Sequence, residues 1–121
     1  MTDPPEDQPV NPDDGVIRIY LVDDHGVVRR GMRAYLEMID DMQVVGEAPN
    51  GEAAVDELGR LAQGGAPPDV VMMDLLMPGM DGITATGLIR DRHPEIEVVA
   101  LTSFVAQDKV QAALAAGASG Y

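Results

Sequence analysis

One acidic residue, Asp74, ends an uninterrupted apolar run and is followed by a loop rich in glycine and proline. The run 70–73 does not alternate with polar residues, which is typical of a strand buried on both faces of a parallel sheet. Pro78, Gly79 and Gly82 then mark where the next element begins. An acid at the C-terminal end of such a strand lies where open α/β sheets bind ligands. Taken alone, Asp74 fits better as the cap of the following turn, and the other strand ends reverse that preference.

Polar side chains also end two other expected strands. Asp23 and Asp24 follow the first strand, and Thr102 follows the fourth. The carboxyl ends of parallel strands share one edge of a sheet, so we expect these residues to meet Asp74 although Asp23 lies 51 positions before it (74 − 23). The sequence therefore predicts one site that holds three carboxylates and a hydroxyl.

Such a site predicts metal-assisted phosphoryl chemistry. Three unpaired carboxylates would repel one another, and Mg²⁺ relieves this because it prefers oxygen ligands and is held by one or two carboxylates plus phosphate. We expect Mn²⁺ to substitute for it. The Asp74 carboxylate is an oxygen nucleophile able to take up a phosphoryl group as an acyl phosphate, while a metal neutralises the transferring oxygens. Thr102 can donate a hydrogen bond to a phosphoryl oxygen.

The elements that must position these residues alternate along the chain. Hydrophobic periodicity predicts strands at 16–22, 43–48, 70–73 and 98–101, a fifth strand beginning at 118–121, and helices at 26–38, 52–61, 82–92 and 107–115. Alternating strands and helices with short loops predict a doubly wound α/β fold, a parallel sheet covered by helices on both faces. His25 is interpreted as a helix-entry residue, and Asp81 as the cap of the third helix.

Composition excludes several other classes. The chain has 121 residues, a net charge of −13 and no cysteine, which excludes disulfides and thiolate metal sites and argues against nucleic-acid binding by this domain. No apolar run is long enough to span a membrane, so we expect a cytoplasmic protein. Residues 1–15 carry four prolines and five acids without a base, and we expect a disordered tail before a single domain at 16–121.

Four motifs in order resemble one family. They are Val22-Asp23-Asp24-His25, the run Met73-Asp74-Leu75-Leu76-Met77-Pro78-Gly79-Met80-Asp81-Gly82, Leu101-Thr102-Ser103, and Ala116-Gly117-Ala118-Ser119-Gly120-Tyr121. Together they resemble the receiver domain of two-component response regulators of the NarL/LuxR type. The resemblance implies a flavodoxin-like sheet in the order 2-1-3-4-5, truncated at strand five with the fifth helix absent.

The resemblance also implies a role for each matching residue. Asp74 would be the phosphoacceptor for a sensor histidine kinase. Asp24 and Asp74 would bind Mg²⁺ directly, Asp23 through a water, and Leu76 through its backbone carbonyl. Thr102 would be the switch hydroxyl.

At the end of the chain, Tyr121 would be the aromatic side chain that turns inward when Thr102 moves toward the phosphate. The family's lysine lies three positions beyond this tyrosine, outside the sequence, and the only lysine here, Lys109, does not match it.

The expected function is a phosphorylation-dependent switch rather than an enzyme. It would change homodimerisation and act on DNA only through a C-terminal domain absent here. One alternative is a Mg²⁺-dependent phosphatase of the haloacid dehalogenase type, although Leu76 stands where that family has a second acid. The other is a pseudo-receiver that binds partners without phosphorylation.

Overall fold

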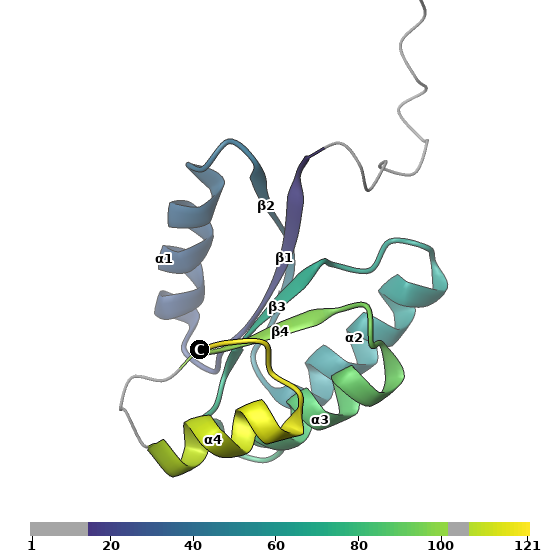
Figure 1. Cartoon of the computed structure of the whole chain (residues 1–121). Helices are drawn as coiled ribbons and strands as arrows, with labels where there is room; N and C mark the ends of the chain where they lie inside the picture. Colours follow the sequence, from purple (N-terminus) through teal and green to yellow (C-terminus); the bar gives the residue numbers. More distant parts are fainter. Residues whose placement is uncertain (1–14, 102–106) are drawn as a thin grey trace, which may run out of the picture.

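The computed structural model describes residues 15–101 and 107–121, and its elements alternate as the sequence predicts (Figure 1). Apart from Gly15, the predicted disordered tail lies outside the described residues. The elements are β1 Ile17–Val22, α1 Gly26–Glu37, β2 Met42–Ala48, α2 Gly51–Gln63, β3 Val70–Asp74, α3 Gly82–Arg92, β4 Glu97–Leu101 and α4 Gln107–Ala116. Every predicted end lies within two residues of the observed one.

The four strands form one parallel sheet in the order β2-β1-β3-β4, which confirms the predicted order for these strands. Val22 at the end of β1 is level with Met73 of β3, and Asp74 is level with Leu101 of β4. The predicted fifth strand is reduced, among the described residues, to a single parallel bridge between Val99 and Gly120 beside β4.

Both faces of the sheet are covered by helices, and the side chains of β1 point alternately to one face and the other. Tyr20 and Val22 face α2 and α3, within a core cluster that also contains Leu58 and Ile89. Ile19 and Leu21 belong to a second cluster, completed from α1 and β2 by Leu36 and Val44. Residues 19–22 of β1 are therefore apolar without alternation, because both of their faces are buried. A smaller third cluster packs α4 against the ends of β3 and β4.

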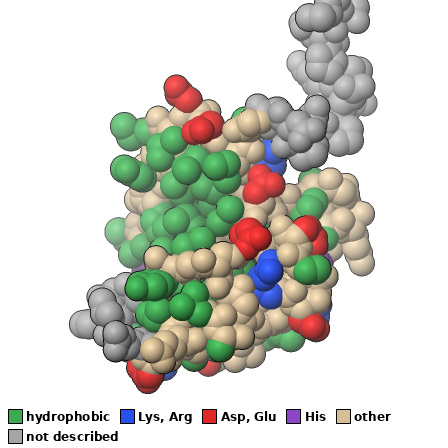
Figure 2. All heavy atoms as spheres, in the orientation of Figure 1, with side chains coloured by type: hydrophobic (Ala, Val, Ile, Leu, Met, Phe, Trp, Pro, Cys, Tyr) green, Lys and Arg blue, Asp and Glu red, His purple; other side chains and the backbone are tan. Residues whose placement is uncertain are grey.

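The side of the molecule that carries α1 keeps much apolar surface (Figure 2). Four of the exposed large hydrophobic side chains belong to this helix or directly follow it: Val27, Val28, Tyr35 and Met38. Met38 is 81% exposed. Large contiguous apolar surfaces of this kind mark interaction sites more often than single exposed side chains do.

Local sequence explains where the helices begin and end. Asn50 Oδ1 accepts a hydrogen bond from Ala53 N at the start of α2, and Asp81 Oδ1 accepts one from Thr84 N at 2.7 Å at the start of α3, as predicted for Asp81. After α4, Gly117 has a φ of +118°, which favours glycine at this helix end. No described helix is both long and apolar enough to cross a bilayer.

Candidate functional site

The ends of β1 and β3 bring the predicted acids together. Asp23, Asp24, His25 and Asp74 each offer one ligand atom, and these four atoms all lie within 4.8 Å of one another. Asp23 and Asp74 are both buried. Neighbouring parallel strands thus place side chains from distant parts of the sequence at the same edge, as the sequence analysis expected.

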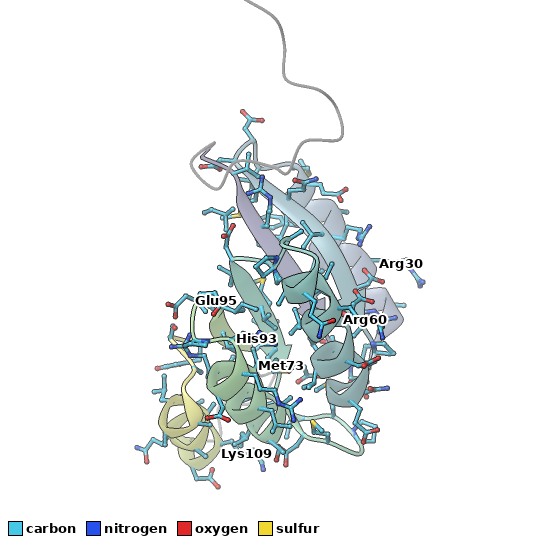
Figure 3. All side chains as sticks on the ribbon, turned by 90° about the vertical axis from the view of Figure 1, so that its right-hand side faces the viewer. Arg30, Arg60, Met73, His93, Glu95 and Lys109 are labelled. Carbon is cyan, nitrogen blue, oxygen red and sulfur yellow. The ribbon has the colours of Figure 1, made fainter. Side chains whose placement is uncertain are left out.

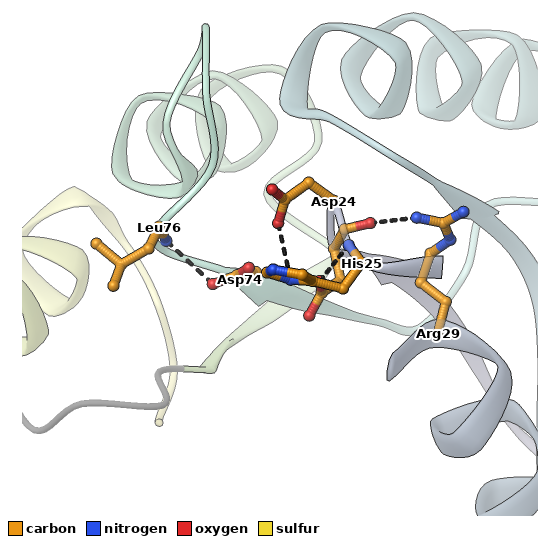
Figure 4. Close-up of polar contacts among 6 residues, drawn as sticks. Asp24, His25, Arg29, Asp74 and Leu76 are labelled. Atoms are coloured by element: carbon orange, nitrogen blue, oxygen red, sulfur yellow. Dashed lines mark hydrogen bonds and ion pairs between the residues drawn. The ribbon is translucent and has the colours of Figure 1, made fainter. Parts of the chain in front are cut away.

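Asp74 is held in a defined orientation at the centre of this group. Its Oδ1 accepts a hydrogen bond of 3.0 Å from the backbone N–H of Leu76 (Figure 4). Burial raises the pKa of the Asp74 carboxyl, the Leu76 N–H opposes that shift, and the charges of Asp23 and Asp24 add to it. The neighbouring groups therefore stabilise the negative charge of Asp74 less well than water would.

The backbone at Asp74 is fixed by a close approach of α3. An ideal Cβ built on Gly82 would lie 2.1 Å from the Asp74 carbonyl oxygen and 2.7 Å from the Leu75 Cα. Only glycine fits there without moving the backbone. Gly82, which the sequence analysis treated as loop punctuation, therefore helps to position the end of β3.

The sequence analysis did not assign His25 to the site, but its side chain lies there. It occupies the N-cap position of α1, but its side chain makes no capping hydrogen bond. Its Nδ1 instead lies 2.9 Å from Asp23 Oδ1 and 3.1 Å from Asp24 Oδ1. The hydrogen bond with Asp23, followed by the charge of Asp24, raises the pKa of the His25 imidazole. The Asp-Asp-His order was a usable signal, because an imidazole next to paired acids is a possible ligand.

Arg29 supports the same loop from α1, a second contact that the sequence analysis did not identify. Its Nη1 donates to the Asp23 carbonyl oxygen at 2.5 Å, and its Nε lies 3.3 Å from Glu47 Oε1. Glu47 also pairs with Arg33, at 3.3 Å. These contacts attach the β1–α1 turn to the end of β2.

The donor set fits a hard divalent cation. Three carboxylates supply oxygen ligands of the kind that Mg²⁺ prefers, and an ion there would relieve their mutual repulsion. Asp24 Oδ1 is buried and accepts no hydrogen bond from the described part of the chain, although the His25 ring lies nearby. A buried carboxylate oxygen of this kind is costly unless a cation or a donor approaches it.

The remaining predicted site residues are Thr102, Tyr121 and Leu76, and the chain's lysine, Lys109, was not among them. Thr102 lies outside the described residues, although it directly follows Leu101, which is level with Asp74. The side chain of Tyr121 is exposed, and Lys109 is exposed on α4 (Figure 3). The Leu76 backbone donates to Asp74 through its N–H, and metal binding by its carbonyl stays a prediction.

The sequence profile of the response regulator receiver domain matches residues 19–121. The chain belongs to the response regulator receiver domain family. The resemblance stated from the four motifs is therefore confirmed, and the match does not favour the phosphatase alternative.

Individual proteins agree with this assignment. The receiver domain is 43% identical over 106 residues to the transcriptional regulatory protein LiaR of Bacillus subtilis, an alignment that covers 88% of this chain and 48% of LiaR. It is 42% identical over 105 residues to the response regulator protein VraR of Staphylococcus epidermidis, covering 87% of this chain and 48% of VraR. The chain thus spans about half the length of the curated relatives it matches.

Solved structures share the fold. A LuxR-family two-component response regulator from Aurantimonas sp. SI85-9A1 superposes with a TM-score of 0.79 at 37% identity, covering 88% of this chain and 72% of the other. The complex of CheX, CheY, BeF3⁻ and Mg²⁺ from Borrelia burgdorferi gives a TM-score of 0.75 at 25% identity, with coverages of 91% and 80%. Both structures share the receiver fold, and the LuxR-family regulator supports a receiver of the NarL/LuxR type.

Proposed function

We propose that this receiver domain is a phosphorylation-controlled switch whose phosphoacceptor is Asp74. One observation carries the proposal: a buried, oriented carboxylate lies at the end of β3 beside two further acids. The family assignment supports the reaction class. The relatives are named as regulators rather than enzymes, and we propose that this chain likewise has no turnover of its own.

The reaction is a transfer from a phosphohistidine of a sensor histidine kinase. An Asp74 oxygen attacks phosphorus, a P–O bond forms, the P–N bond breaks, and the departing imidazole nitrogen takes up a proton. The Leu76 N–H holds Oδ1. Its partner oxygen, Oδ2, is therefore the nucleophile that we propose.

Mg²⁺, or Mn²⁺ in its place, would be bound by Asp24 and Asp74 directly, by Asp23 through a water and by the Leu76 carbonyl. When bound, the ion supplies neutralising charge for the transferring oxygens. The three-carboxylate arrangement of Asp23, Asp24 and Asp74 supports this donor set, and the Borrelia CheY complex contains the same ion. Arg29 would keep the β1–α1 turn in place through the Asp23 carbonyl.

The switch would act through Thr102 and Tyr121. The Thr102 hydroxyl would donate to the phosphoryl group and draw the segment after β4 inward, and the exposed Tyr121 ring would follow. We propose that the change alters homodimerisation and, through a DNA-binding domain outside this sequence, transcription in the cytoplasm. The exposed apolar side of α1 supports self-association.

The test is uptake of a phosphoryl group or its mimic. Incubation with acetyl phosphate and Mg²⁺ should add one phosphoryl mass to the wild type and none to Asp74→Asn, read by intact mass. Beryllofluoride with Mg²⁺ should shift NMR resonances around Asp74. Asp24→Ala should weaken Mg²⁺ binding by about tenfold or more. Phosphorylation retained elsewhere in Asp74→Asn would overturn the assignment.

The same assays separate the remaining alternatives. A phosphatase would release phosphate continuously from a generic phosphoester, whereas a switch gains mass once per chain. A pseudo-receiver would neither gain mass nor respond to beryllofluoride. Thr102→Ala should still accept the phosphoryl group while the Tyr121 resonances stop responding to it.

A further inference from the structure

We propose that Glu47, which lies on β2 outside the acidic cluster, is a positioning residue for the site. It acts through Arg29, which holds the backbone of the β1–α1 turn. The inference rests on the proposed function, because the turn matters there as the segment that carries Asp23 and Asp24. The experiment is chosen so that the two can fail separately.

The first argument is a bulge in β2. The consecutive β1 residues Ile19 and Tyr20 pair with Val44 and Gly46, so Val45 is an extra residue in β2. An extra residue shifts the alternation of side chains by one position, and bulges next to functional sites often re-aim a side chain in this way. The end of β2 nearest the site therefore has its side chains reversed relative to the start of the strand.

The core clusters agree with this reversal. Val44 and Ala48 lie four positions apart and would share a face in a regular strand. Val44 belongs to the cluster that contains Leu36 of α1, whereas Ala48 belongs to the cluster that contains Leu58 of α2, on the opposite face of the sheet. Glu47 therefore faces α1, and without the extra residue it would point to the face that α2 covers.

The second argument is the pairing that Glu47 makes on that face. Its Oε1 accepts a hydrogen bond of 3.3 Å from Arg29 Nε, and its Oε2 lies 3.3 Å from Arg33 Nε. The two arginines lie four positions apart on α1, where like charges repel each other. The Glu47 carboxylate between them offsets this repulsion and fixes the Arg29 guanidinium.

The third argument is what the other end of the Arg29 guanidinium holds. Its Nη1 donates to the Asp23 carbonyl oxygen at 2.5 Å (Figure 4). Asp23 Oδ1 in turn accepts a hydrogen bond of 2.8 Å from the backbone N–H of His25. A continuous chain of contacts thus runs from Glu47 through Arg29 to the turn that presents the two acids of β1.

The experiment compares the Mg²⁺ affinities of Glu47→Gln, Arg29→Gln and the double variant by calorimetry. Charge alone predicts opposite effects, because losing an acid near the site weakens cation binding and losing a base strengthens it. Positioning predicts that each single variant binds Mg²⁺ about tenfold more weakly, at the lower end of what changes behind a metal ligand cost. The double variant should also lose about tenfold rather than about a hundredfold, since Glu47 acts through Arg29.

The matched control for the lost charge is Glu52→Gln. Glu52 lies in the first turn of α2, at the same edge of the sheet, and forms no ion pair with a described residue. Its substitution should change Mg²⁺ affinity less than about twofold, because a charge in solvent is screened by salt.

Amide hydrogen exchange of the metal-free protein gives a second measurement. The His25 N–H should exchange about tenfold faster in Glu47→Gln and in Arg29→Gln, while the amides of the sheet keep their rates. A variant that was only less stable overall would speed the exchange of both.

Four results would overturn the inference. They are unchanged Mg²⁺ affinity in Glu47→Gln, tighter binding in Arg29→Gln, losses that add in the double variant, and unchanged exchange of the His25 N–H. Failure of the proposed function would look different, since the wild type would then gain no phosphoryl mass on Asp74. The exchange measurement needs neither metal nor phosphate, so it tests the role of Glu47 in that case as well.

Discussion

Replacing Gly82 by alanine should destabilise the domain and disturb the site together. The new Cβ would lie 2.1 Å from the Asp74 carbonyl oxygen, 1.3 Å short of the 3.4 Å at which ordinary contact begins. The atom in the way belongs to the backbone of β3, so it cannot move as a flexible side chain would. Overpacking of this kind costs about 3 kcal/mol, and the gain in helix propensity returns at most about 1 kcal/mol.

The matched control is Gly87→Ala in the same helix. A Cβ at Gly87 meets no described heavy atom within 4 Å, so this variant should gain about 0.5–1 kcal/mol from helix propensity. Urea unfolding of both variants should therefore separate them by roughly 2.5–4 kcal/mol.

The same displacement moves Asp74, so Gly82→Ala should also bind Mg²⁺ and beryllofluoride more weakly. A Gly82→Ala variant as stable as Gly87→Ala, with unchanged metal affinity, would refute the close approach. If stability fell and the site were unaffected, α3 would have moved rather than the end of β3.

Three further predictions concern charge, capping and surface. Asp74→Asn should be more stable than the wild type to urea unfolding in EDTA at pH 7, because it removes a buried carboxylate whose pKa is raised in the folded state. This advantage should shrink as pH falls through the folded pKa of Asp74 and vanish below the usual 3.8. Asp81→Ala should lose about 1 kcal/mol at neutral pH, whereas Asp91→Ala on the same helix should not. The Thr84 N–H lowers the pKa of Asp81, so this deficit should fade as pH drops below 3.8 toward the lower folded value. Met38→Lys should weaken self-association in sedimentation velocity more than Leu114→Lys on α4, and equal sedimentation would remove α1 from the contact.

Much of the fold followed from the sequence because the strands are apolar without alternation and end at polar residues. The bounds of α3 were predicted fully, since Asp81 caps its start and Pro94 follows its end. The gathering of Asp23, Asp24 and Asp74 followed from parallel strand ends alone.

What the sequence analysis missed depends on side-chain direction and close approach. His25 was interpreted as a helix-entry residue, because a linear pattern does not reveal which way an N-cap side chain turns. Gly82 was interpreted only as a residue that ends the loop, although any side chain at this position would collide with the backbone of Asp74. The predicted beginning of a fifth strand, by contrast, is present beside β4 as the parallel bridge between Val99 and Gly120 in the described residues.

The parallel sheet has a consequence for the order in which the domain folds. Parallel neighbours cannot be joined by a tight hairpin, so β1 and β3 can pair only after a long segment of chain has been ordered between them. Contacts of such high sequence separation form slowly, because loop closure costs entropy before the contact rewards it. The acidic site contains Asp23 and Asp74, so no local fragment can assemble it. A cation that binds only the assembled site would act as a late reporter of folding and, by mass action, would slow unfolding rather than guide the early steps.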